Sequence, residues 1–197
     1  MSAYLRTWVG AVFVACVLAG CGGSGPSFKN TDITGADYGK DFALTDHTGK
    51  TRTRADFRGK AVVMFFGYTR CPDVCPTTLA ELKAVKEQLG EDGKRLQVLF
   101  VTVDPERDTQ KLLANYVPAF DPSFIGLYGD SAATAKVAKD FRVFYQKSPG
   151  KTPESYTVDH TAGSYVFDPQ GRLRLFVRHG NAANLAADVR VLLNASG

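Results

Sequence analysis

The chain has 197 residues, of which 44% are hydrophobic and 22% charged, and its formal net charge is +4. This composition is that of a globular domain, and it excludes a wholly disordered chain, a collagen and a coiled coil. The basic residues are scattered, so the composition does not indicate nucleic acid as a partner. Four cysteines are too few for a disulfide scaffold of this length.

The first twenty residues have the features of a bacterial lipoprotein signal peptide. An apolar run extends from Trp8 to Gly20, which matches a signal-peptide core and is too short to span a bilayer as a helix. The run ends in LAGC at residues 18–21, which resembles a lipobox. We therefore expect cleavage before Cys21 and lipidation of its thiol, with an uncleaved anchor or an ordinary secretory signal as the alternative. The mature protein is then anchored on the extracytoplasmic face of a bacterial membrane, the periplasmic side in a Gram-negative cell.

Three segments follow from this interpretation. Residues 1–20 are the signal peptide, residues 21–39 are a lipidated tether with an extended N-terminal segment, and residues 40–197 are one folded domain. The tether begins with glycine and serine and has neither helical nor strand periodicity. Such a composition is typical of a flexible linker.

The first half of the domain predicts a hairpin followed by a βαβ unit. Residues 42–45 and 50–53 flank a turn and have the pattern of a hairpin. Residues 61–66 and 96–103 are apolar runs, typical of strands buried on both faces. Between them, residues 76–89 have helical spacing and end at a glycine, so the crossover is expected to be right-handed.

The second half predicts helices and a further hairpin. Helices are expected over residues 109–116, 131–140 and 183–193, and strands over 124–128, 162–167 and 173–177. The last two strands flank the turn DPQG. Together the elements predict one α/β domain with a mixed central sheet flanked by helices and with an N-terminal hairpin.

Two cysteines, Cys71 and Cys75, lie where the first buried strand gives way to the first helix. The N–H groups and partial positive charge of a helix start favour a thiolate, and Arg70 adds a positive neighbour. If the helix includes both residues, their Cβ atoms lie ~5–6 Å apart, whereas an ideal disulfide needs ~3.8 Å. The spacing therefore favours a metal between the two sulfurs, with redox cycling or a structural disulfide still open.

The histidines supply candidates for a third ligand. His160 precedes the strand 162–167, and imidazole together with thiolates suits copper or zinc. His47 lies in the first hairpin turn and is expected to be solvated. His179 ends a strand and is a weaker candidate.

Two acids lie close to these motifs in the sequence. Asp104 ends the second buried strand. It either supports the cysteine loop and a docking partner, or caps its own turn and pairs with Arg107. Asp159 precedes His160, and adjacent residues of an extended chain point to opposite faces, so we expect an orienting surface acid and no ligand. Both are candidates for a supporting role around the metal site.

Three motifs together resemble the Sco/SenC family of copper chaperones of cytochrome c oxidase assembly. They are GYTRCPDVCP at residues 67–76, VDPERDT at 103–109 and VDHT at 158–161. The resemblance extends over roughly residues 32–194. It implies a thioredoxin-like fold and a copper site formed by Cys71, Cys75 and His160. It also implies delivery of copper to the binuclear CuA centre of cytochrome c oxidase subunit II.

The leading hypothesis is therefore a copper-binding metallochaperone, not an enzyme, that carries Cu(I), Cu(II) or both. The expected partners are subunit II, another copper chaperone or a thioredoxin-like reductant, and the membrane through the lipid. The alternative is an extracytoplasmic thiol–disulfide oxidoreductase that uses Cys71 and Cys75 to reduce the cysteines of the copper target. A peroxidase-like thiol enzyme, with Thr69 and Arg70 beside the attacking cysteine, is a third class.

Overall fold

The computed structural model describes residues 26–152, 155–180 and 182–195. The expected signal peptide, Cys21 and the beginning of the tether lie outside these residues. Over the described ranges, no helix has the length and apolar character needed to cross a bilayer.

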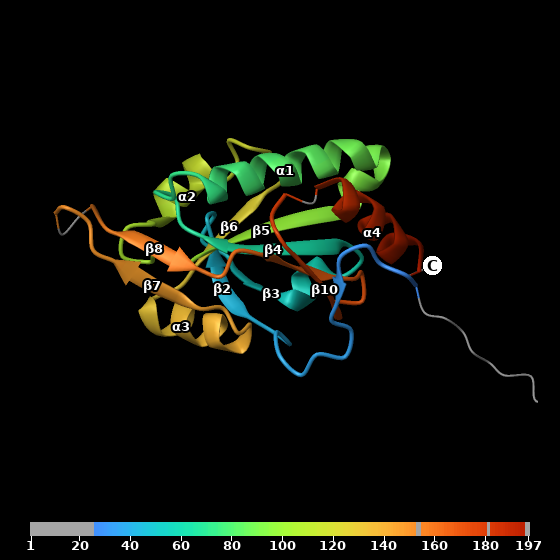
Figure 1. Ribbon diagram of the computed structural model, residues 1–197, viewed down its shortest axis with the longest axis horizontal. Helices are drawn as coiled ribbons and strands as arrows, with labels where there is room; N and C mark the ends of the chain where they lie inside the picture. The colour runs from blue at the N-terminus through green and yellow to red at the C-terminus, as the bar shows by residue number, and fades with distance from the viewer. Residues whose placement is uncertain (1–25, 153–154, 181, 196–197) are drawn as a thin grey trace, which may run out of the picture.

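A mixed sheet forms the centre of the molecule (Figure 1). Its strands, in chain order, are β1 (Thr31–Asp32), β2 (Ala43–Asp46), β3 (Thr51–Thr53), β4 (Ala61–Gly67), β5 (Leu96–Thr102), β6 (Ile125–Tyr128), β9 (Ser164–Phe167) and β10 (Leu173–Val177). Their order across the sheet is β1-β10-β9-β4-β5-β6-β2-β3. The pairs β4–β5 and β5–β6 are parallel, and the others are antiparallel.

Helices cover the sheet. They are α1 (Val74–Leu89), α2 (Gln110–Tyr116), α3 (Ser131–Asp140) and α4 (Ala182–Asn194), with short 3-10 helices at η1 (Arg54–Phe57) and η2 (Gly90–Arg95). In Figure 1, α1 runs above the strands and α3 below them. The predicted α/β class, the mixed sheet flanked by helices and the N-terminal hairpin β2–β3 are confirmed. Helix α1 begins two residues before its predicted start.

The predicted βαβ unit positions the candidate site. Every residue of β4 and β5 is buried, which is why these strands are apolar runs without alternation. They pair in parallel from Ala61 opposite Leu96 to Gly67 opposite Thr102. Because parallel strands end at the same edge of a sheet, the loops after β4 and β5 lie next to each other.

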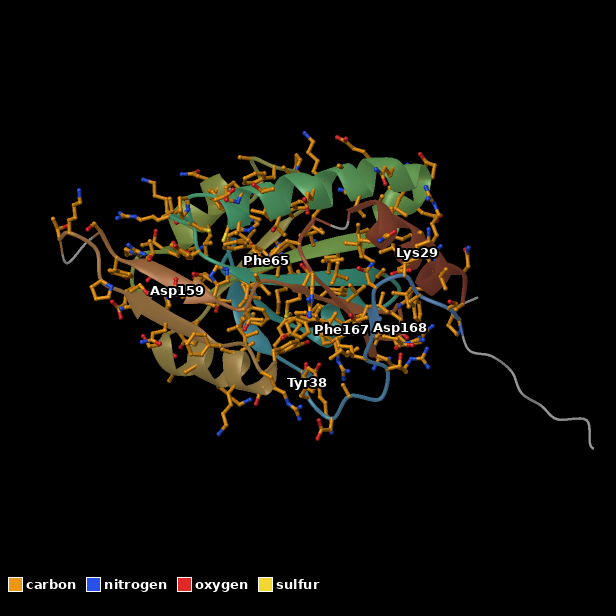
Figure 2. The ribbon with its side chains drawn as sticks, viewed as in Figure 1. Lys29, Tyr38, Phe65, Asp159, Phe167 and Asp168 are labelled. Atoms are coloured by element: carbon orange, nitrogen blue, oxygen red, sulfur yellow. The ribbon has the colours of Figure 1, made fainter. Side chains whose placement is uncertain are left out.

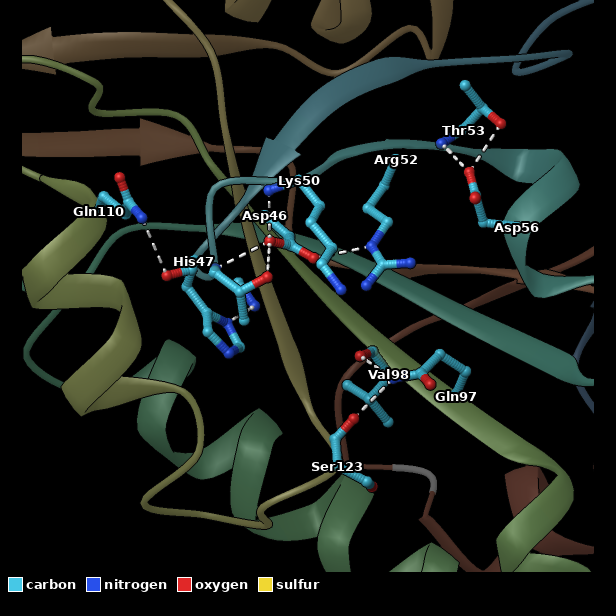
Figure 3. A network of polar contacts seen from close by, with 12 residues as sticks. Asp46, His47, Lys50, Arg52, Thr53, Asp56, Gln97, Val98, Gln110 and Ser123 are labelled. Carbon is cyan, nitrogen blue, oxygen red and sulfur yellow. Dashed lines mark hydrogen bonds and ion pairs between the residues drawn. The ribbon is translucent and has the colours of Figure 1, made fainter.

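The turn of the β2–β3 hairpin is organised by one carboxylate (Figure 3). The side chain of Asp46 is 1% exposed. It accepts hydrogen bonds from the backbone N–H groups of Thr48 and Lys50 and from Nε of Arg52. Burial raises the pKa of this carboxyl, but the hydrogen bonds from Thr48 and Arg52 outweigh it, and the net pKa lies below its usual value.

His47 in the same turn is not solvated as expected. It is half-buried, and its Nδ1 accepts a hydrogen bond of 3.0 Å from the backbone N–H of Gly126. The neighbouring strand β6 thereby holds the ring.

The predicted hairpins are β2–β3 and β9–β10, and a third hairpin, formed by β7 (Tyr145–Ser148) and β8 (Thr157–His160), was not predicted. Its strands pair with each other in a separate two-stranded sheet, and Figure 1 shows the pair projecting beside the central sheet. Both strands carry exposed polar side chains, so they lack the apolar alternation that reveals a half-buried strand.

Residues 28–32 of the N-terminal segment contact the folded domain. Strand β1 pairs with β10, and Phe28 packs against the core. The backbone N–H groups of Lys29 and Asn30 donate to the carboxylate of Asp188, a residue that is 1% exposed. The boundary between tether and domain at residues 39 and 40 stays a prediction.

Candidate metal centre

The two cysteines lie where β4 leads into α1, as predicted. Cys71 is half-buried in the loop before the helix, whereas Cys75 is in the first helical turn and fully buried, and both are free thiols. Close packing explains the glycine that ends β4. A Cβ on Gly67 would lie 2.8 Å from Sγ of Cys75, so a larger residue there would push the thiol out of place.

The environment of Cys75 differs from the expectation. Burial raises the pKa of this thiol, and the hydrogen bond with Cys71 adds to the effect. The predicted lowering by the helix start is therefore wrong for Cys75, because desolvation disfavours the thiolate more strongly. The helix N–H acts on Cys71 instead: the backbone N–H of Cys75 donates to Sγ of Cys71 at 3.4 Å. A metal that binds Cys75 must displace its proton.

His160 lies against this pair, although it is 85 residues from Cys75 in the sequence. His160 is the last residue of β8, and the following strand, β9, begins at Ser164. Nδ1 of His160 lies 3.0 Å from the carbonyl oxygen of Val158. A carbonyl only accepts, so Nδ1 carries the proton and Nε2 keeps a free lone pair. That Nε2 lies 3.9 Å from Sγ of Cys75.

This spacing fits a metal ion between the two atoms. With bonds of about 2.3 Å to sulfur and 2.0–2.1 Å to imidazole nitrogen, a trigonal angle places the donors ~3.8 Å apart. Across the described part of the chain, no three His, Cys, Asp or Glu side chains are already gathered closely enough to hold a metal. Cys75 and His160 already have this separation, and Sγ of Cys71 lies beside Cys75 as the third candidate donor, 3.4 Å from its backbone nitrogen.

Aromatic rings surround the imidazole. The ring of Tyr68 meets that of His160 edge-on at 5.9 Å between centroids, and the ring of Phe65 lies at 6.4 Å. Figure 2 shows Phe65 in the interior and Asp159 on the projecting hairpin. A cavity of about 290 Å³ opens beside Cys71 and His160 and leaves both side chains accessible, whereas the buried Cys75 does not line it.

The ring of His179 also packs against Phe65. The centroids of their rings are 5.7 Å apart, and Nδ1 of His179 is 2.6 Å from Oγ1 of Thr78. Burial lowers the pKa of this histidine. Its ring contacts α1 one turn beyond Cys75.

The two predicted acids have separate partners. Asp104 is fully buried, forms an ion pair with Arg107, and accepts a hydrogen bond of 2.7 Å from the hydroxyl of Tyr156. The predicted ion pair is therefore present. Asp159 is exposed and accepts a 2.6 Å hydrogen bond from Oγ of Ser148, across the β7–β8 hairpin.

Asp108 was not among the residues predicted to support the site. This residue is 1% exposed, and its carboxylate accepts hydrogen bonds from the backbone N–H and hydroxyl of Thr69 and from the hydroxyl of Thr102. The signal that points to it is the VDPERDT motif, in which Asp108 is the third acid, after Asp104 and Glu106.

Known proteins resemble this chain over most of its length. A family model described as SCO1/SenC matches residues 30–194. Among curated relatives, the mitochondrial "Protein SCO2 homolog" of Bos taurus is 41% identical over 150 residues, which cover 75% of this chain and 56% of the relative. The chain thus spans little more than half the length of the curated relatives it matches.

Two solved structures have the same architecture. ScoI of Bradyrhizobium japonicum with copper bound is 42% identical, with a TM-score of 0.72 and coverage of 80% of this chain and 99% of that one. Apo Sco1 of Thermus thermophilus is also 42% identical, with a TM-score of 0.75 and coverage of 86% and 99%. The predicted thioredoxin-like fold is confirmed.

Proposed function

The chain belongs to the SCO1/SenC family, and on this premise we propose that it is a copper metallochaperone with Cys71, Cys75 and His160 as ligands. The Sco family is a family of cytochrome c oxidase assembly proteins, and relatives of this chain have been solved with copper bound. The observation that carries the proposal is the 3.9 Å approach of His160 Nε2 to Cys75 Sγ.

The donor set suits a carrier of copper. Thiolates favour Cu(I), and imidazole extends the site to Cu(II). Three donors leave one side of the ion open, so a recipient can take it by ligand exchange. Because cysteine binds the metal as a thiolate and not as a thiol or a disulfide, the Cys71–Cys75 pair must be reduced, and loading must release protons.

The proposed recipient is the binuclear CuA centre of cytochrome c oxidase subunit II. This follows from the resemblance of the three motifs to the family and from the role of Sco proteins in oxidase assembly. A second copper chaperone would supply the ion, and a thioredoxin-like reductant would keep the cysteines reduced. Nucleic acid is not among the proposed partners.

The proposed location is the extracytoplasmic face of a bacterial membrane. Lipidation of Cys21 would anchor the protein there, and the oxidising environment would make reduction of the cysteine pair a separate requirement. Metabolic labelling with a fatty acid analogue tests the anchor: label is expected in the natural chain and is lost on Cys21→Ala.

A copper titration of the reduced protein tests the site. Cu(I) is followed against a competing chelator, and Cu(II) by its thiolate charge-transfer absorption. One tight equivalent is expected, weakened by His160→Ala and unchanged by His47→Ala, a control on the distant β2–β3 turn. Copper binding that does not depend on His160 would overturn the proposed ligand set.

A thiol–disulfide oxidoreductase is the second candidate, favoured by the unequal burial of the cysteines. The half-buried Cys71 thiolate would attack a disulfide of the copper target, and Cys75 would then displace the target thiolate. Two electrons pass to the target, and a Cys71–Cys75 disulfide remains. A protein that binds no tight copper but reduces an oxidised CuA-domain peptide would support this function instead.

A further inference from the structure

The loop of residues 104–109 contains two buried carboxylates that belong to no ligand set. It connects β5 to α2, and Asp104 and Asp108 in it are 0% and 1% exposed. Burying a carboxylate is costly unless charges and hydrogen bonds compensate it. The partners of these two acids therefore show what the loop holds in place.

Asp108 holds the segment that carries the cysteines. One carboxylate oxygen accepts from the hydroxyl of Thr69 at 2.5 Å, and the other from the backbone N–H of Thr69 at 3.0 Å and the hydroxyl of Thr102 at 2.6 Å. Thr69 is two residues before Cys71. Asp108 thus fixes the start of the cysteine loop to the end of β5.

Asp104 and Arg107 hold the segment that carries the histidine. The hydroxyl of Tyr156 donates to Asp104 at 2.7 Å, and Nη1 of Arg107 donates to the carbonyl oxygen of Tyr156 at 2.9 Å. The guanidinium also lies over the ring of Tyr156, 3.5 Å from its centroid, where a cation–π attraction adds to the contact. Tyr156 directly precedes β8, which ends at His160.

A further contact joins the two segments. The guanidinium of Arg107 lies 5.8 Å from the ring centroid of Tyr68. Tyr68 belongs to the cysteine loop, and its ring meets the imidazole of His160 edge-on. The loop 104–109 therefore contacts the cysteine side and the histidine side of the site at once.

We propose that the loop 104–109 is a bracket that sets the distance between the cysteine loop and the hairpin bearing His160. In this arrangement Asp104, Asp108 and Tyr156 are positioning residues for the metal site. The inference rests on the proposed copper site, because it assigns these residues to its geometry. If the contacts of Tyr156 are weakened, the imidazole of His160 is no longer held in position, while the two thiols stay in place. The affinity for Cu(II) should then fall more than the affinity for Cu(I).

Tyr156→Phe tests the histidine side of the bracket. The variant removes the hydroxyl bonded to Asp104 and keeps the ring over Arg107. Loss of a group that orients a metal ligand typically weakens binding 10- to 100-fold. We expect a loss of about 10-fold or more for Cu(II) with a shifted charge-transfer band, and less than about 3-fold for Cu(I). Tyr128→Phe is the matched control, because its hydroxyl bonds Gln110 on the surface at 3.1 Å.

Thr69→Val tests the cysteine side. It removes the hydroxyl bonded to Asp108 while keeping the shape of the side chain. Affinity for both Cu(I) and Cu(II) should fall, because both thiols follow this residue. Thr69→Ser retains the hydroxyl and should restore the affinity, and urea unfolding of both variants separates a loss of copper binding from a loss of stability.

The imidazole resonances of His160 in the reduced, metal-free protein give a readout independent of copper. Tyr156→Phe should shift them, and Tyr128→Phe should leave them in place. Unchanged His160 resonances together with unchanged Cu(II) binding in Tyr156→Phe would overturn the bracket. If the natural chain binds no tight copper, the proposed function fails, and the resonances still decide whether the loop positions His160.

Discussion

Asp46 and Asp104 are both almost completely buried carboxylates beside an arginine, but their partners come from different distances along the chain. Those of Asp46 are Thr48, Lys50 and Arg52, all within six residues. Those of Asp104 include Tyr156, which is 52 residues away. The first carboxylate closes a turn, and the second joins two segments that approach each other only in the folded protein.

Because their partners differ, the two buried carboxylates are expected to differ in their importance for metal binding. The hydrogen bonds that the Asp46 carboxylate accepts all come from residues of its own β2–β3 hairpin (Figure 3). Its loss should change stability alone. The Asp104 and Asp108 network is part of the support of the candidate metal site, so its loss should change stability and metal binding together.

The largest effect is expected for Asp46→Ala. Removing one partner of a buried ion pair costs 3–5 kcal/mol, and because Arg52 keeps 26% of its side chain exposed we expect about 2–3 kcal/mol. Urea unfolding of the reduced protein measures this loss. The Cu(II) absorption of the folded variant should match that of the natural chain, and a shifted band would contradict the separation of the two regions.

Gly67→Ala should affect both properties. The added Cβ would lie 2.8 Å from Cys75 Sγ and 2.9 Å from the rings of Phe100 and Phe65. Overpacking of this kind costs about 1–3 kcal/mol, and it displaces a candidate ligand. Unfolding gives the first effect, and a Cu(I) competition titration gives the second, expected as weaker binding. A destabilised variant with unchanged Cu(I) affinity would show that the thiol position is not critical.

Gly49→Ala is the matched change in the other region. Gly49 has φ of +89° in the β2–β3 turn, a conformation that costs an alanine about 1–2 kcal/mol. Stability should fall by about that amount, and copper binding should stay the same. Comparison with Gly67→Ala then separates general destabilisation from a local effect on the site.

The smallest effect is a pH dependence at Asp46. Its pKa is lowered in the folded state, so its contribution to stability is fully present above the unfolded pKa of about 3.9 and is lost as pH falls below it. We expect the natural chain to lose about 1 kcal/mol more than Asp46→Asn between pH 6 and pH 3. Urea midpoints across this range test the difference, and parallel curves would contradict it.

Much of the fold was predictable because its signals are local. Burial within one stretch of chain produces the apolar runs of β4 and β5 and the apolar face of α1. The hairpin turns are marked by their own turn residues. The β7–β8 hairpin was not predicted because it lacks such a local signal. Its residues are mostly polar and exposed. Val158 and Tyr145 pack against the core, and further contacts are with the loop 104–109.

The candidate site was predictable in its members but not in its geometry. Spacing and motif indicated Cys71, Cys75 and His160. They did not indicate that desolvation raises the pKa of Cys75, because that depends on residues packed around the thiol from other elements. They also did not indicate that His160 ends a hairpin outside the central sheet.

The sequence by itself determined the α/β class, the order of most elements, the family resemblance and the candidate ligands, because periodicity and motifs are properties of neighbouring residues. Tertiary structure alone decided that His160 reaches Cys75 across 85 residues, that Cys75 is buried as a thiol, and that two buried acids contact both sides of the site. Distances and desolvation of this kind arise only when segments far apart in the chain are packed together.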